Sequence, residues 1–398
     1  MINPSINGWI DKFFIEQKLE VTTNFDANSF YLDTRKTGFI FGYITSIDSS
    51  PKIDIENLLT NEISKIALLN TLFKVYCLND KNCNHDDFIK KVVAFYNQID
   101  NEGFSILKKI LPKNHPSQHL EEFINERVKT NENIINKNFS FLITNALLFV
   151  DVLAFNQYLI NDKIPEKYLK KIEETLMSIV SLALKTKSNK LIYDDLLIKF
   201  FEASVRYTKF SDIGNQNLEN LNLDYFVNDL EKKYFIDLAG LSLWSDGIVA
   251  NNEAYFLYKL AEIMQIPDSF VAQSIVDTND FITTNKEQIP YFNNSNPVKN
   301  FYDQTTQTVV KLILRNKKRL VKEISESKEL MVLLAKSTQR DLDDKEKKKV
   351  KAQLLDICKS VPSLTIFLIP GGSLLLPILI KFIPQLLPSS FNENLEEE

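Results

Sequence analysis

The stretch Val361–Phe391 limits the possible folds of this chain more than any other part of it. Its first 20 residues, Val361–Ile380, carry no charge, and Lys381 is the one charged residue in the whole stretch. A run of this length can form a membrane-spanning helix. Proline, however, lacks a helix donor and clashes with the preceding turn. The prolines and the glycine pair inside the run therefore predict short helical pieces, with a turn at Pro370–Ser373 and a second interruption at Pro377.

The composition predicts an all-α protein with several domains. The chain has 398 residues, of which 44% are hydrophobic and 25% charged, and it contains 9 glycines. Apolar residues recur at helical spacing along most of it. Ser140–Ile160 predicts a buried core helix rather than a membrane span, because polar residues are scattered through it. Thr37–Ile47, rich in β-branched and aromatic residues, is the best strand candidate; it fits either a hairpin arm or a loop held against helices.

Two polar, asparagine-rich stretches, Gly214–Leu223 and Thr278–Pro297, predict breaks between domains. The resulting division has four parts: an N-terminal helical domain at 1–213, a middle helical domain at 224–277, long basic helices with the apolar module at 298–391, and an acidic tail at 392–398.

Positive charge is concentrated in one segment. The chain has a net charge of -5, yet residues 296–360 hold 16 lysines and arginines against nine aspartates and glutamates. A basic segment in an acidic chain indicates an anionic partner, such as phospholipid or RNA. Asp343 and Glu346 predict a capping box that starts the second basic helix. The candidate basic contacts are Arg315, Lys317, Lys318, Arg319, Lys347, Lys348, Lys349 and Lys351.

The middle of the chain contains IDLAGLSLWSDGIVANNEAYF. Asp246 and Gly247 predict a tight turn between two helices, because glycine takes a positive φ without strain. Glu253 lies in the first turn of the second helix, where its charge complements the helix dipole. Together with Ala239 and Gly240, this order resembles the TerB-type helical domain of tellurite-resistance proteins. Asp246 and Glu253 supply too few oxygens for a calcium site, so their predicted roles are structural.

The C-terminal order is a basic helix, a Val361-Pro362 junction and regularly spaced prolines within apolar residues. It resembles the LETM-type family, the leucine-zipper/EF-hand-containing transmembrane proteins of mitochondria and their bacterial relatives. The resemblance implies ribosome binding or inner-membrane cation/proton exchange. Bacterial chains that combine it with a TerB-like middle are associated with biofilms. Predicted membrane or partner contacts are Phe367, Leu368, Pro370, Leu374, Leu375, Pro377, Lys381, Phe382, Pro384, Pro388 and Phe391.

Mitochondrial relatives have an aromatic and an acidic residue where this chain has Gly371, Gly372 and Ser373. Without a carboxylate in Val361–Ile380, cation exchange loses its natural proton or cation carrier. We therefore expect a non-enzymatic, membrane-associated interaction protein whose partners are lipid, the ribosome or RNA, or another protein. The alternatives are cation/proton exchange and a soluble helical scaffold that buries the apolar run.

No catalytic motif accompanies the three histidines His85, His115 and His119. His115 and His119 are four residues apart, but Pro116 interrupts them and no acidic partner completes a metal-protease motif. The three cysteines have neither metal spacing nor an even number, which favours a reducing compartment. The N-terminus lacks a secretory signal pattern. We expect a cytoplasmic protein with no cofactor, metal or small-molecule substrate.

Overall fold

The computed structural model describes residues 2–17, 26–101, 115–129, 137–187, 217–244, 251–287, 310–340 and 342–360. Within these residues the regular structure is helical and no strand occurs, which confirms the all-α prediction. The chain divides into two compact units, Met1–Asn294 and Ser295–Glu398. We call them unit 1 and unit 2.

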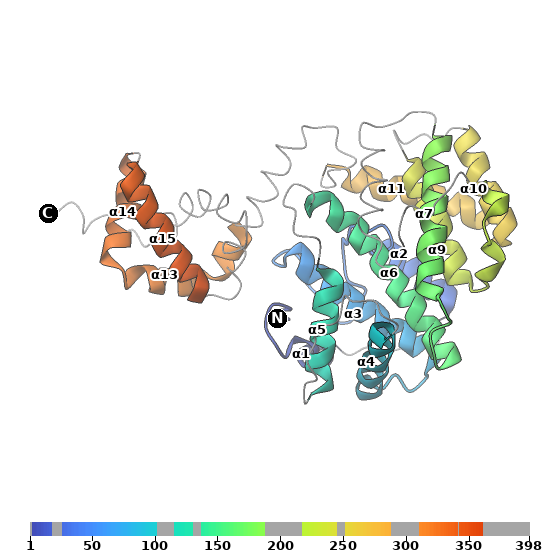
Figure 1. Ribbon diagram of the computed structural model, residues 1–398, viewed down its shortest axis with the longest axis horizontal. Helices are drawn as coiled ribbons and strands as arrows, with labels where there is room; N and C mark the ends of the chain where they lie inside the picture. The colour runs from blue at the N-terminus through green and yellow to red at the C-terminus, as the bar shows by residue number, and fades with distance from the viewer. Residues whose placement is uncertain are drawn as a thin grey trace. The chain divides into compact units, whose positions relative to one another are not determined.

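Unit 1 is a multi-layered helical body (Figure 1). Helix α3 packs along α6, α7 packs along α9, and α10 and α11 both pack on α9. The helices of unit 1 are α1 (Trp9–Glu16), α2 (Ala27–Lys36), α3 (Thr60–Asn79), α4 (His85–Asn101), α5 (Pro116–Val128), α6 (Lys137–Asn161), α7 (Tyr168–Thr186), α9 (Asp229–Leu243), α10 (Asn251–Met264) and α11 (Asp268–Asn285), with short 3-10 turns η2 (Leu218–Asn220) and η3 (Leu223–Tyr225).

Helix α6 lies inside unit 1, as its sequence predicts. Every residue from Ala146 to Asn156 is buried, so this part of the helix has no solvent face. Its one charged side chain, Asp151, is neutralised by a bidentate ion pair with Arg127 and accepts a further hydrogen bond from the Tyr96 hydroxyl. Among the described residues, no helix combines the length and apolar character needed to cross a membrane.

The strand predicted at Thr37–Ile47 is wrong, and the alternative of a loop held against helices is correct. Residues 37–42 form turns, and residues 43–49 have no regular secondary structure. Gly38 and Gly42 have φ values of 80° and 79°, which break a strand. Phe39, Ile40 and Phe41 are nevertheless buried, so the β-type composition serves packing rather than pairing.

The polar stretch Gly214–Leu223 does not separate two compact units. Helix α9, which follows it, packs against both α7 and α2, so the helices before and after the stretch share the core of unit 1. The division lies instead at Asn294 and Ser295, inside the second predicted break, Thr278–Pro297.

Unit 2 contains a helical segment at 310–315, followed by α13 (Lys317–Ser325), α14 (Lys328–Gln339) and α15 (Asp344–Ser360). Helix α14 packs along α15, and α13 contacts both (Figure 1). The apolar repeat of Val298–Leu334 is thus divided, where described, at Asn316 and again at Glu326–Ser327.

Candidate functional site

The start of α15 is fixed by the capping box that the sequence predicts. Asp343 Oδ1 accepts hydrogen bonds from the backbone N–H groups of Lys345 and Glu346, both at 2.8 Å. In return, Glu346 Oε2 accepts from the backbone N–H of Asp343 at 3.0 Å. This reciprocal pair satisfies donors that a helix start otherwise leaves without partners. It also fixes the helical phase of the lysines that follow.

The apolar sides of the three helices face one another and form the core of unit 2. Each fully buried leucine or isoleucine stabilises the bundle by roughly 1.5–3 kcal/mol. In α15, Leu355 is half-buried and Ile357 is buried. The buried side chains are Leu320 and Ile324 of α13, Leu330, Leu333 and Leu334 of α14, and Val350, Leu354, Ile357 and Cys358 of α15.

Several cations of unit 2 are used to join its helices. The Arg340 guanidinium donates two hydrogen bonds to Glu346, at 2.8 and 2.7 Å, and Lys336 lies 3.8 Å from the same carboxylate. These contacts, Arg340 above all, lower the pKa of Glu346 to about 2. Lys349 pairs with Glu329 at 2.6 Å, and Lys349 lowers the pKa of that carboxyl as well.

Arg319 joins α13 to the far end of α15. Its Nη2 donates to the backbone oxygen of Ser360 at 2.8 Å, where a positive charge complements the helix C-terminus. Arg319 and Lys349 were predicted as external contacts, but the structure gives both of them partners inside unit 2. Arg315 is half-buried and also interacts within the chain.

A second group of lysines has no such partner. In the described part of unit 2, these side chains are exposed and make no ion pair or hydrogen bond. We call them the free lysines: Lys311, Lys317, Lys318, Lys322, Lys328, Lys345, Lys347, Lys348 and Lys351. They include five of the eight predicted basic contacts. The arrangement can bind an extended anion without breaking any bond inside the unit.

The predicted contacts of the apolar run, from Phe367 to Phe391, lie outside the described residues, as do Asp246 and Gly247 of the predicted turn. Glu253 is in the first turn of α10, as predicted, and its side chain is buried.

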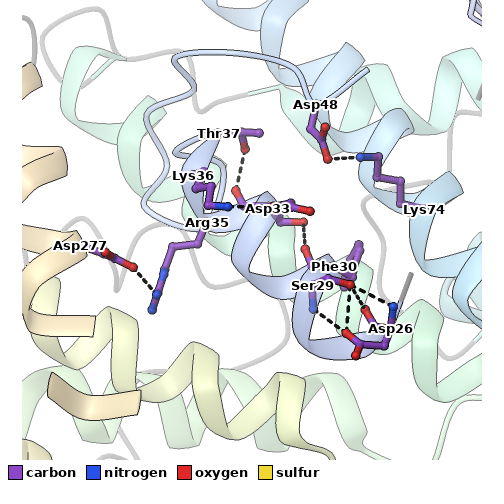
Figure 2. A network of polar contacts seen from close by, with 11 residues as sticks. Asp26, Ser29, Phe30, Asp33, Arg35, Lys36, Thr37, Asp48, Lys74 and Asp277 are labelled. Carbon is purple, nitrogen blue, oxygen red and sulfur yellow. Dashed lines mark hydrogen bonds and ion pairs between the residues drawn. The ribbon is translucent and has the colours of Figure 1, made fainter. Parts of the chain in front are cut away.

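Sequence reasoning missed a buried polar cluster in unit 1. Asp237 of α9 is fully buried and pairs with Arg35 of α2 at 3.1 Å. It also accepts hydrogen bonds from the hydroxyls of Tyr31, at 2.6 Å, and Ser274. Figure 2 shows Arg35 reaching Asp277, its second acidic partner. The sequence feature that could have revealed this cluster is a single aspartate inside the apolar run of α9. The cluster joins α2, α9 and α11, and it leaves no open site.

Glu231 is a buried carboxylate, and no cationic side chain among the described residues lies at hydrogen-bonding distance from it. It accepts from the Tyr168 hydroxyl at 2.6 Å and from Gln157 Nε2 at 2.8 Å. Burial raises the pKa of Glu231.

A small polar hollow beside Asn70, Asp48 and Lys74 has room for about one water molecule. Within the described ranges, no three histidine, cysteine or acidic side chains are grouped so as to hold a metal ion.

Comparison with known proteins finds a similarity in the C-terminal part of the chain. Residues 342–398 match the family model described as LETM1-like, RBD, the ribosome-binding domain. Neither the curated proteins nor the solved structures include a chain that matches this one. The match begins at Leu342, one residue before the Asp343 cap, and contains all of α15. The C-terminal module of this chain is thus similar to the LETM1-like ribosome-binding domain over 57 of the 398 residues.

Proposed function

We propose that this protein is a non-enzymatic interaction protein whose unit 2 binds the ribosome. The observation that carries the proposal is the match of residues 342–398 to the ribosome-binding family model. Free lysines at the start of α15 lie inside the matched region. Because ribosomal RNA is a dense polyanion, exposed lysines without internal partners are the side chains best placed to contact it.

Helices outside the match support the matched one. Glu329 is in α14 and Arg340 is the C-cap residue of that helix, yet their partners Lys349 and Glu346 are on α15. The interaction module is therefore the whole of unit 2 rather than the matched residues alone. Removing α14 would expose the apolar side of α15, including the fully buried Val350 and Leu354.

Unit 1 in this proposal is a helical body with a structural role. Its two most buried ion pairs, Arg35–Asp237 and Arg127–Asp151, tie together helices that are distant in sequence. The TerB-like resemblance of α9 and α10 supports a structural role for this region, since Gly240 of α9 lies against Ser274 and Thr278 of α11.

Co-sedimentation with purified ribosomes from the organism that encodes the chain tests the proposal. The full chain is expected in the ribosome pellet, and a variant ending at Arg340 is expected in the supernatant. Circular dichroism of the shortened variant checks that unit 1 remains folded. Equal pelleting of both proteins, or of neither, would overturn ribosome binding through unit 2.

The uncharged run Val361–Ile380 favours a second candidate function, membrane association. Flotation of the full chain with anionic vesicles, lost when residues 361–391 are removed, is the expected result for that function. Flotation that is absent in the full chain would rule it out.

A further inference from the structure

We infer that unit 2 recognises the phosphate backbone of double-helical RNA through its free lysines, and not a base sequence or a lipid surface. The inference rests on the proposed ribosome binding and names the component of the ribosome that is contacted. It depends on three observations: the like-charge spacing of the free lysines, their distribution along the helices, and the absence of aromatic residues from the described part of unit 2.

The spacing of the free lysines lowers the stability of the helices that carry them. Lys318 and Lys322 are four residues apart in α13, as are Lys347 and Lys351 in α15, and like charges at this spacing weaken a helix. Asp343, four residues before Lys347, has its carboxylate engaged in the cap. An external anion that neutralises these lysines would relieve the repulsion.

Several lysines of unit 1 show the opposite arrangement. Lys12 pairs with Glu16, and Lys170 with Glu174, each at 3.5 Å and four residues apart. Lys91 pairs with Asp87 at 3.1 Å in the same way. The unpaired, like-charged pattern of α13 and α15 is thus a local departure from a common arrangement in unit 1.

The free lysines extend along the bundle rather than forming one point charge. Lys345–Lys351 occupy the first two turns of α15, whereas the Arg319–Ser360 hydrogen bond places the start of α13 at the other end of that helix. At 1.5 Å rise per residue, positions 345 and 360 are about 22 Å apart. The free lysines are thus spread over a length comparable to that of several successive phosphates of a nucleic-acid strand.

The described helices of unit 2 offer no aromatic side chain on which a base could stack. Residues 310–340 and 342–360 contain no phenylalanine, tyrosine, tryptophan or histidine. Single-stranded RNA is commonly bound by stacking its bases on aromatic side chains, whereas a duplex presents mainly backbone. Lysines alone therefore favour the duplex.

The buried apolar sides of α13 and α15 argue against binding of these helices to a lipid surface. A helix that lies in a membrane surface inserts its apolar side among the lipids. In α13 and α15 that side is occupied by the core of unit 2, where Leu320, Val350 and Leu354 are all fully buried. The exposed large apolar residues in the described part of unit 2, Leu314 and Val332, are on neither helix.

Binding of the full chain to a fluorescent RNA duplex over a salt series tests the inference. The variant K318Q/K322Q/K348Q/K351Q removes four free lysines. Its control, K12Q/K91Q/K129Q/K170Q, removes four positive charges of unit 1 that already have partners. Each lost phosphate contact flattens the plot of log K against log salt by about 0.7–0.9. We expect the first variant to flatten the plot by about three and to weaken binding on the order of 100-fold.

The control is expected to change the salt slope by less than about one. A lysine-to-arginine version of the first variant keeps the charge and should restore binding, which separates lost contacts from misfolding. The inference is overturned if both variants lose the same slope, if a single strand of equal length binds more tightly than the duplex, or if anionic vesicles outcompete the duplex.

Ribosome pelleting of the same variants separates the inference from the proposed function. If the wild-type chain and K318Q/K322Q/K348Q/K351Q pellet equally with ribosomes, ribosome binding stands and RNA contact through the free lysines is wrong. If the wild-type chain binds the duplex but not ribosomes, the proposed function falls and the lysines are a general duplex-binding surface.

Discussion

Arg340 and Glu346 form a two-pronged contact, with hydrogen bonds of 2.8 and 2.7 Å, that joins the end of α14 to the start of α15. The same Glu346 carboxylate completes the capping box with Asp343. One side chain therefore fixes both the start of α15 and its attachment to the bundle. Arg340 therefore has a partner inside unit 2, which distinguishes it from the free lysines.

Removing the cap should loosen α15 selectively. We expect Asp343→Ala to reduce the stability of this helix by about 1 kcal/mol, because two backbone donors lose their acceptor. Faster hydrogen exchange of the first-turn amides of α15 would measure the loss. Asp344→Ala is the matched control, since the neighbouring aspartate accepts no capping hydrogen bond. Equal effects of the two substitutions would contradict the role of Asp343.

The buried pair of Arg35 and Asp237 should be far more sensitive than a surface pair. Asp237→Asn leaves the buried guanidinium with only Asp277, and we expect unit 1 to lose about 3 kcal/mol. The control Glu174→Gln breaks the exposed Lys170–Glu174 pair and should cost less than about 1 kcal/mol. Urea unfolding followed by tryptophan fluorescence reports unit 1 specifically, because both tryptophans, Trp9 and Trp244, belong to it.

Two glycines provide a matched test of the loop at residues 37–42. Both Gly8 and Gly38 have positive φ, at 88° and 80°. A Cβ on Gly38 would lie 2.0 Å from the backbone oxygen of Tyr43, whereas one on Gly8 meets nothing within 4 Å. We expect Gly8→Ala to cost about 1 kcal/mol from backbone strain, and Gly38→Ala at least about 2 kcal/mol more. Similar losses in urea unfolding would show that the Gly38 clash is relieved by a loop shift.

The raised pKa of Glu231 makes unit 1 sensitive to pH. Burial favours the protonated carboxyl in the folded state, so its contribution to stability is present at low pH and is lost as pH rises through the folded pKa. We expect Glu231→Gln to be more stable than the wild type at pH 8, because Gln can still accept from Tyr168 and Gln157.

That advantage should shrink as pH falls towards 4. Urea unfolding at several pH values measures it, with the exposed Glu166→Gln as control. A Glu231→Gln variant that is less stable than the wild type at every pH would show that the charged form is the favoured one.

Local sequence patterns predicted the features that depend on neighbouring residues. The Asp343–Glu346 capping box is contained within four residues, and the polar interruptions of α6 were enough to assign it to a core. The strand prediction at Thr37–Ile47 failed because β-type composition outweighed the turns at Gly38 and Gly42. Packing partners distant in sequence decided that segment.

Local sequence patterns could not predict which cations of unit 2 have partners inside the unit and which are free. Lys349 finds Glu329 20 positions away, and Arg319 finds the Ser360 carbonyl 41 positions away. Such pairs form only once the three helices of unit 2 have packed. In the sequence, Lys348 and Lys349 are equivalent; in the structure, one is exposed without a partner and the other joins two helices.

Crosslinking in living cells from position 348 tests ribosome binding by unit 2 most directly. A photoreactive lysine analogue at Lys348 would capture what the free lysines contact, and the same analogue at Lys170 of unit 1 serves as the control. We predict crosslinks to ribosomal RNA from position 348 and none from position 170. Crosslinks from position 348 that contain only lipid, or only proteins outside the ribosome, would contradict ribosome binding through this surface.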